Sequence, residues 1–424
     1  MVKTAPFILL LGCFDTKGEV FDYLRQSLLD QGQRVVTVNI GILGSTELFP
    51  VDIEADLVAR EGGQEIQALR DKRDRGFAVE VMGRGAARIA AKLYAEGGVK
   101  GAIGMGGGGG TFMVLSAMRV LPFGLPKLCI STLAVKDLSH TIGSKDITLV
   151  PSVVDVAGLN SISRVLIRQS AAAIAAMAKE PIQDSRKHKG RVAISMFGNT
   201  TACVDKCTAL LEQEGYEVFA FHANGQGGRT MEALIKESYF DGVLDITTTE
   251  LADDLFGGIC GAGPERLNAA GDMAIPQVVV PGCMDMVNFG SLDSVPEKYK
   301  NRQLYSWAPD VTLMRTNREE NVLLGERLGA KVNQAFGPVT VLLPLKGLSQ
   351  LDSEGQKFHR AEANQALFNT IIDKVREPAT VFEVVAHINE PSFARQAVDS
   401  LLLMMEEREK SINRREFKAG KHGI

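Results

Sequence analysis

The chain has 424 residues, of which 45% are hydrophobic and 23% are charged, and its formal net charge is -4. This composition is typical of a globular protein of two or three domains. The absence of a basic excess argues against a nucleic acid or an anionic membrane as partner. The apolar stretch 170–178 is far shorter than the roughly 20 residues that span a bilayer. Six scattered cysteines without a Cys-x-x-Cys pair predict a reduced, cytoplasmic protein.

Apolar, strand-like runs alternate with amphipathic helical stretches in the first part of the chain. The run 7–12 predicts a buried strand, and the helix that follows it ends at Gly32. Further strands are expected at 34–41, 99–106 and 126–132. Continuous apolar strands separated by helices predict a parallel sheet covered on both faces.

A second α/β domain is expected after a polar linker. An alanine-rich helix beginning near Asn160 ends before Pro181, and residues 182–190 are polar and basic without an apolar period. The predicted domains are therefore 1–182 and 183–424. Seven strands are expected in the second domain, at 191–198, 216–225, 240–250, 274–282, 310–316, 338–347 and 379–388.

The stretch "GMGGGGGT", residues 104–111, predicts a strand, a turn and a helix that begins near Thr111. In this geometry backbone N–H groups and the helix dipole face an anion, and glycine allows phosphate oxygens to approach. Thr111 would cap the helix and donate its hydroxyl to the same oxygens. A flexible loop or a tight packing crossover is the alternative. The stretch matches neither a Walker motif nor the first Rossmann turn. The predicted phosphate-binding residues here are Gly106, Gly107, Gly108, Gly109, Gly110 and Thr111.

The first turn, "GCFDTKGE", adds a second set of candidate contacts. Asp15 and Thr16 precede a helix, which either of them would cap. Lys17 at a helix N-terminus opposes the dipole unless an anion lies beside it, which predicts a phosphate or magnesium contact. Ser131 and Thr132 end a strand and should open onto the same carboxyl edge of the sheet.

Polar residues also follow the strands of the second domain. His222 is a candidate general base, and Glu250 or Asp285 would orient it or donate a proton. Arg315 and Lys346 suit a carboxylate or phosphate. Each residue alone also has a structural explanation, as a hydrogen-bonded side chain, a helix start or a capped turn. No His-x-x-x-His or Asp-x-Asp spacing predicts a metal site, although magnesium accompanying a nucleotide stays open. The predicted substrate contacts are Asn224, Gly227, Gly228, Arg229 and Asn288.

Several long motifs in fixed order resemble the tomato mosaic virus resistance protein family and its bacterial relatives. They include "GCFDTKGE", "GGGGGT", "PSVVDVAGLNSISR", "FHANGQGGRTME", "LDITTTELADDLFGG" and "PGCMDMVNFG", and the resemblance covers roughly residues 5–405. It implies two Rossmann-like subdomains, ATP binding and a homodimer. The plant member continues into a barrel domain, so a separate barrel-domain protein is an implied partner. Cys13 replaces a threonine of the family pattern, Gly108 or a neighbouring glycine replaces a serine, and Val135 and Lys136 replace a Ser-Gly pair.

Three functional hypotheses follow. The leading one is an ATP-binding enzyme that acts on a small acidic or phosphorylated metabolite, with the glycine run holding the phosphates. The second is a nucleotide-gated regulatory module that docks a protein partner. The third is an NAD-linked dehydrogenase, because the glycine run also resembles the pyrophosphate loop of iron-dependent alcohol dehydrogenases. Asn39 ends the second strand where an acidic ribose ligand is usual, and the histidines lack metal-ligand spacing, which both argue against the third hypothesis.

Overall fold

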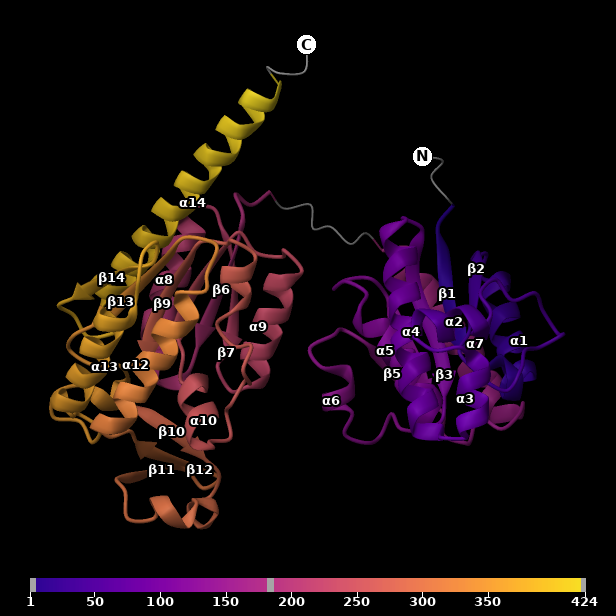
Figure 1. Cartoon of the computed structure of the whole chain (residues 1–424), viewed down its shortest axis with the longest axis horizontal. Helices are drawn as coiled ribbons and strands as arrows, with labels where there is room; N and C mark the ends of the chain where they lie inside the picture. Colours follow the sequence, from indigo (N-terminus) through magenta and orange to yellow (C-terminus); the bar gives the residue numbers. More distant parts are fainter. Residues whose placement is uncertain (1–4, 181–186, 421–424) are drawn as a thin grey trace. The chain divides into compact units, whose positions relative to one another are not determined.

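The computed structural model describes residues 5–180 and 187–420, which belong to two compact units, Met1–Ser185 and Arg186–Ile424 (Figure 1). The expected boundary after residue 182 and the start of the expected linker fall on 181–186, outside the described residues. Each unit contains a parallel sheet with helices on both faces, so the predicted α/β fold class is confirmed.

The sheet of unit 1 has five parallel strands in the order β2-β1-β3-β4-β5. The four predicted strands are confirmed. The fifth was not predicted because its residues are at least partly exposed and lack a buried apolar run. The strands are β1 (Phe7–Gly12), β2 (Val35–Asn39), β3 (Val99–Gly106), β4 (Lys127–Ser131) and β5 (Thr148–Pro151).

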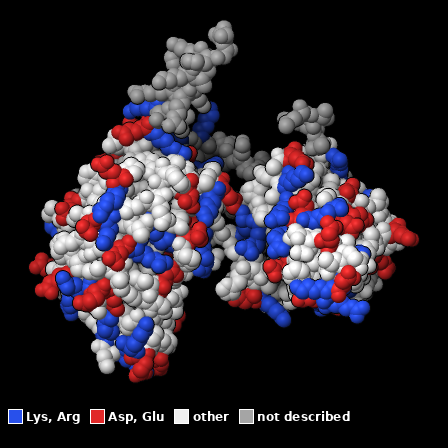
Figure 2. Space-filling view, in the orientation of Figure 1, with Lys and Arg blue, Asp and Glu red and all other residues white. Residues whose placement is uncertain are grey.

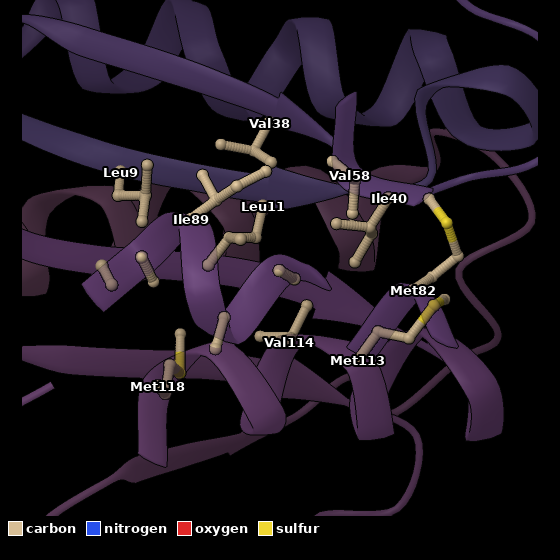
Figure 3. Close-up of a cluster of buried hydrophobic side chains, with 14 of the residues drawn as sticks. Leu9, Leu11, Val38, Ile40, Val58, Met82, Ile89, Met113, Val114 and Met118 are labelled. Atoms are coloured by element: carbon tan, nitrogen blue, oxygen red, sulfur yellow. The ribbon is translucent and has the colours of Figure 1, made fainter. Parts of the chain in front are cut away.

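Alternate side chains of the unit 1 strands pack on opposite faces of the sheet. Leu9 and Leu11 lie in the cluster drawn in Figure 3, which also contains Met82 and Val114 of two helices. Ile8 belongs to the cluster on the other face, under α1 and α7. The helices are α1 (Phe14–Asp30), α2 (Ala55–Glu61), α3 (Ile66–Lys72), α4 (Arg75–Ala95), α5 (Gly108–Arg119), α6 (Ser139–Ile142) and α7 (Ser161–Met177).

The main sheet of unit 2 has six parallel strands in the order β14-β13-β9-β8-β6-β7. Helices α8 and α14 cover one face, and α9 to α13 lie on the other. The strands are β6 (Arg191–Met196), β7 (Glu217–His222), β8 (Gly242–Thr247), β9 (Gln277–Gly282), β13 (Val339–Pro344) and β14 (Thr380–Val384). The helices are α8 (Thr201–Gln213), α9 (Gln226–Lys236), α10 (Glu250–Phe256), α11 (Ala269–Asp272), α12 (Arg318–Val332), α13 (Ala361–Lys374) and α14 (Pro391–Gly420).

One of the seven strands expected in the second domain lies outside the main sheet of unit 2. Residues 310–316 form β12 (Val311–Arg315), which pairs antiparallel with β10 (Met286–Phe289) and β11 (Leu304–Ala308) in a separate small sheet. The local pattern of β12 was interpreted correctly as a strand. Its partner strands β10 and β11 were not predicted, because strand pairing depends on contacts that are distant in sequence.

Both parallel sheets reverse their strand order beside their first strand, at β1/β3 in unit 1 and at β6/β8 in unit 2. The loops that leave neighbouring strands at such a point run in opposite directions and open a crevice at the carboxyl edge. In unit 1 these loops are the first turn and the glycine run. Acidic and basic side chains are interspersed over the face shown in Figure 2. Among the described residues, no helix is both long and apolar enough to span a membrane.

Candidate functional site

A cavity of about 860 Å³ lies in unit 1 among the loops that follow β1, β3, β4 and β5. The structure brings nearly all of the predicted cofactor contacts together there. Asp15 and Thr111 are the exceptions: Asp15 lines a neighbouring cavity of about 500 Å³, and Thr111 is buried beneath the glycine run. The predicted residues that line the larger cavity are Thr16, Lys17, Gly106, Gly107, Gly108, Gly109, Gly110, Ser131 and Thr132.

The glycine run begins helix α5 earlier than expected. The helix starts at Gly108 rather than near Thr111, with Gly107 as its N-cap, and no side chain of the described residues caps it. Gly108, Gly109 and Gly110 therefore form the first turn, where backbone N–H groups have no acceptor within the helix. All three glycines line the cavity.

The glycines of this segment fall into two groups. A Cβ atom on Gly104 would lie 2.6 Å from Val114 Cγ1, and one on Gly106 would lie 2.6 Å from the carbonyl carbon of Gly110. These two glycines let β3 and α5 approach each other. A Cβ on Gly108 would meet nothing within 4 Å, and no residue from 106 to 110 has a positive φ. Neither packing nor backbone conformation requires glycine at position 108.

Thr111 does not cap the helix, which corrects the prediction. It is fully buried, its hydroxyl donates to the carbonyl oxygen of Gly106 at 3.0 Å, and it lies 2.7 Å from the Ser131 hydroxyl. The Ser131 hydroxyl also accepts from the backbone N–H of Leu133 at 2.9 Å. Thr111 and Ser131 thus join α5 to β4. Thr132, which is half-buried, also lines the cavity.

The first turn also differs from the expectation. Helix α1 starts at Phe14, so Asp15 and Thr16 lie inside its first turn and do not cap it. Asn39 Oδ1 instead accepts from the N–H of Phe14 at 3.3 Å. The Asp15 carboxylate accepts from the N–H of Leu43 at 2.8 Å, which holds it to the loop after β2.

Two cations, Lys17 and Arg75, line the larger cavity. Lys17 has non-helical φ and ψ of -131° and 23°. Within residues 5–180, no carboxylate forms an ion pair with either cation, and Asp155 is the acidic residue that lines the cavity. Arg75 was missed from the sequence. It is the first residue of α4, and the dipole argument that singled out Lys17 applies to it equally.

Two exposed valines, Val135 and Val153, line the same cavity, with 81% and 72% of their surface accessible. Val153 has a φ of 63°, a backbone conformation that is strained for a β-branched residue. Strained, exposed apolar residues of this kind concentrate at ligand sites. The larger cavity therefore combines an amide-rich helix start, two cations and an apolar wall.

In unit 2 the predicted catalytic Glu250 is completely buried and forms an ion pair with Arg266 at 2.5 Å. Its carboxylate accepts from the N–H groups of Gly225 and Gly228 at 2.7 and 3.2 Å. A Cβ on Gly228 would lie 2.3 Å from a carboxylate oxygen of Glu250. Gly228 therefore makes room for Glu250, and the interpretation that it makes room for a substrate is corrected. Likewise, a Cβ on Gly227 would lie 1.9 Å from the carbonyl oxygen of His222.

Asp285 and Arg315 lie in a second buried network. Ser349 donates to Asp285 at 2.7 Å, and burial, reinforced by the charge of Asp352, raises the pKa of Asp285 to about 7. The guanidinium of Arg315 donates to backbone carbonyls, to Asp352 at 3.3 Å and to Asn364 at 2.7 Å. β12 lies outside the main sheet, yet its last residue, Arg315, reaches the loops after β9 and β13.

The remaining predicted residues of unit 2 are dispersed. Asn288 is buried and donates to Asp253 at 2.6 Å, where burial raises the pKa of Asp253 to about 8. His222 is exposed and packs edge-on against Phe197, with ring centroids 5.2 Å apart. The other three are exposed: Asn224 accepts from Gly227, Arg229 donates to Gly261, and Lys346 lies 3.8 Å from Glu390.

The structure therefore does not join these residues into one catalytic cluster. Within residues 187–420, no hydrogen bond or ion pair links His222 or Lys346 to Glu250, Asp285 or Arg315. Sequence reasoning missed Arg266, whose surroundings in the chain, "GPERLN", resemble an ordinary exposed turn. Nor do any three His, Cys, Asp or Glu of the described residues gather as metal ligands.

Two models of one protein family together match nearly the whole length of the chain. Residues 6–183 match the N-terminal domain, and residues 189–405 the C-terminal domain, of the Uncharacterised protein family (UPF0261). A UPF0261 protein of Clostridium tetani is 44% identical over 400 residues, which cover 94% of this chain and 99% of that protein. The ToMV resistance protein Tm-1(GCR237) of Solanum lycopersicum is 39% identical over 77% of this chain, which spans 44% of the tomato protein.

Similarity to solved structures is much weaker. A UDP-N-acetylglucosamine 2-epimerase from Rickettsia bellii covers 65% of this chain and 78% of its own, with 9% identity and a TM-score of 0.22. That score is too low to support an argument about function. The two matched domains and the bacterial and tomato relatives together show that the chain belongs to the UPF0261 family.

Proposed function

We propose that unit 1 binds ATP, with the phosphates at the start of helix α5. The observation that carries this proposal is Gly108, which lies in an uncapped first turn where a Cβ atom would meet no protein atom within 4 Å. A glycine costs conformational entropy wherever it is ordered, so one without a structural need favours a ligand that requires close approach. Backbone amides at a helix N-terminus are a common phosphate site.

The other groups of the cavity suit a nucleotide. Lys17 and Arg75 would neutralise phosphate charge, and the Thr16 and Thr132 hydroxyls are hydrogen-bond donors at the same cavity. Val135 and Val153 would pack against an apolar base. A volume of about 860 Å³ lies within the range of cavities that hold cofactors. Magnesium would arrive with the triphosphate, with Asp155 as the acidic residue at the cavity.

A dinucleotide is less well supported. Asn39 ends β2, and its amide is engaged inside the protein, where Nδ2 donates to Gly44 at 2.9 Å and to Glu54 at 3.1 Å. It therefore does not replace the acidic ribose ligand that NAD-binding folds place at this strand end. The NAD-linked dehydrogenase stays the weakest of the three hypotheses.

We propose that the bound ATP serves a reaction on a small acidic or phosphorylated metabolite. A nucleotide-gated module that docks a protein partner is the second candidate. One observation favours it: Glu250 and Arg315, both predicted to be catalytic, are saturated by bonds within unit 2. Turnover of metabolite pools with ATP by the full chain distinguishes the two, because a docking module gives capture of the partner without turnover.

A thermal-shift experiment tests ATP binding. Ligands that bind only the native state raise its melting temperature. We expect MgATP to raise the melting temperature of the wild-type chain but not that of Gly108→Val, whose new side chain would occupy the phosphate position. Gly108 is preferable to Gly109, where a Cβ would lie 3.1 Å from Val79 Cγ2 and disturb packing.

Gly158→Val is the matched control. It is also a glycine of unit 1 whose Cβ would meet nothing within 4 Å, and it does not line the cavity. The control should keep the full response to MgATP. An equal rise in Gly108→Val and the wild type, or no rise in the wild type, would contradict the proposal.

A further inference from the structure

Helices α12 and α13 of unit 2 pack side by side and run in the same direction. A Cβ on Gly325 would lie 2.7 Å from Thr370 Cβ, and one on Gly329 would lie 2.8 Å from Lys374 Cβ. Contacts thus advance together along both helices, and these glycines allow the close approach. Parallel neighbours place their N-termini at the same end, where the positive ends of two helix dipoles add.

A cavity of about 480 Å³ lies at this shared end. Its lining includes the N-cap and first residue of both helices, Asn317 and Arg318 for α12 and Arg360 and Ala361 for α13. Asn317 caps α12 through the N–H of Glu320, whereas no side chain within residues 187–420 caps α13. The start of α13 therefore offers uncapped amides at the cavity, whereas Asn317 and Glu320 already form a capping box at the start of α12.

The lining is rich in arginine. Arg315 is 3% exposed, and its guanidinium is fixed by six hydrogen bonds, one of them to the Asp352 carboxylate, so it supplies rigidity rather than bonds to a ligand. Arg302 forms a two-point ion pair with Glu320, at 2.7 Å for both bonds. Both guanidinium groups are ion-paired, Arg302 with Glu320 and Arg315 with Asp352, so these two residues build a rigid wall whose charge is already balanced.

Arg318 and Arg360 remain for a ligand. Both are exposed, and no carboxylate within residues 187–420 forms an ion pair with either; Arg360 donates only to the carbonyl oxygen of His359, at 2.8 Å. A cation at a helix N-terminus opposes the dipole, and here this occurs on two adjacent helices. Glu362 is the acidic residue that lines the cavity, so the positive charge is only partly balanced.

We infer that this cavity binds the phosphate group of a small phosphorylated metabolite. An uncapped helix start and two unpaired arginines beside a rigid wall match a multiply charged anion better than a single carboxylate. The inference deepens the proposed function, since it places the metabolite in unit 2. It depends on the proposed function only for the class of ligand, a phosphorylated metabolite. Binding of this ligand in unit 2 does not require ATP in unit 1.

Calorimetric titration of the full chain with glycerol 3-phosphate tests the inference, because this probe has a phosphate monoester and no base. We expect Arg318→Gln/Arg360→Gln to bind the probe at least about tenfold more weakly than the wild type, since two charge-assisted hydrogen bonds are lost. Arg395→Gln is the matched control, because it removes an exposed arginine of α14 outside the cavity. Gly108→Val, which alters unit 1, should also bind normally.

The outcomes separate this inference from the proposed function. Unchanged binding of the probe by the double variant, or an equal loss of probe binding in Arg395→Gln, would overturn the inference. No binding by the wild type at millimolar concentrations would overturn it as well. Loss in Gly108→Val alone would show that the probe enters the unit 1 cavity, which contradicts the inference and leaves ATP binding standing.

Discussion

Replacing Arg266 with methionine should strongly destabilise unit 2. The side chain is completely buried, and its guanidinium donates to both oxygens of Asp245 at 2.6 and 2.5 Å. It also donates to Glu250 at 2.5 Å and to Glu232 at 3.2 Å. Methionine fills a similar volume but leaves three buried carboxylates without their cation.

The expected loss of folding stability is large. Removing one partner of a buried ion pair costs about 3–5 kcal/mol, which corresponds to a melting temperature roughly 6–20 °C lower for a unit of this size. The loss should also depend on pH. Burial already raises the pKa of Glu232, and Arg266 opposes that rise. Without Arg266 the folded-state pKa rises further, so the deficit should be smallest below 4.5, the ordinary glutamate value, and grow as the pH increases.

Urea denaturation measures both effects. Trp307 is the one tryptophan of the sequence and lies in unit 2, so its fluorescence reports on this unit. Lys236→Met is the matched control, because Lys236 forms a partly exposed ion pair with Glu265 at 3.2 Å and should cost less than about 1 kcal/mol. A loss in Arg266→Met as small as that of the control, or one independent of pH, would refute the structural role assigned to this network.

Three further predictions concern individual groups. Gly106→Val should unfold unit 1, because its Cβ would lie 2.6 Å from backbone atoms of α5; a native circular dichroism spectrum would be incompatible with this. Lys17→Met should weaken ATP binding by about tenfold in calorimetry, since a charge-assisted bond is lost, without changing the melting temperature of the free protein. Asp253 has a pKa raised to about 8 from 3.8, so its contribution to stability is full below 3.8 and lost as the pH rises through 8. Asp253→Asn should therefore flatten the pH dependence of urea unfolding by up to about 1.4 kcal/mol per pH unit, and an unchanged slope would exclude this titration.

The sequence was informative where local pattern determines structure. Continuous apolar runs such as 7–12 and 99–106 predicted the strands of the parallel sheet, and strand order then placed their following loops at one edge. Lys17 was identified as a cavity residue from the conflict between its charge and a helix dipole. This conflict involves only neighbouring residues, so it can be recognised from the sequence alone.

Prediction failed where burial depends on distant partners. Glu250 follows a strand just as a catalytic residue would, and only the folded structure shows it paired with Arg266. Arg266 itself looks like a surface residue because its acidic partners come from three other segments. The start of α5 was misplaced because glycine has low helix propensity, whereas packing of the helix on Gly106 overrides that preference.

The central claim is that the amides of Gly107 to Gly110 bind phosphate, and their NMR resonances test it most directly. Glycine-selective ¹⁵N labelling reduces the spectrum to the 43 glycines of the chain, and Gly108→Ala assigns one of the four signals. Addition of MgATP should move these amide proton resonances downfield, as expected for hydrogen bonds to phosphate, while adenosine should leave them in place. Unmoved resonances at saturating MgATP would contradict the claim.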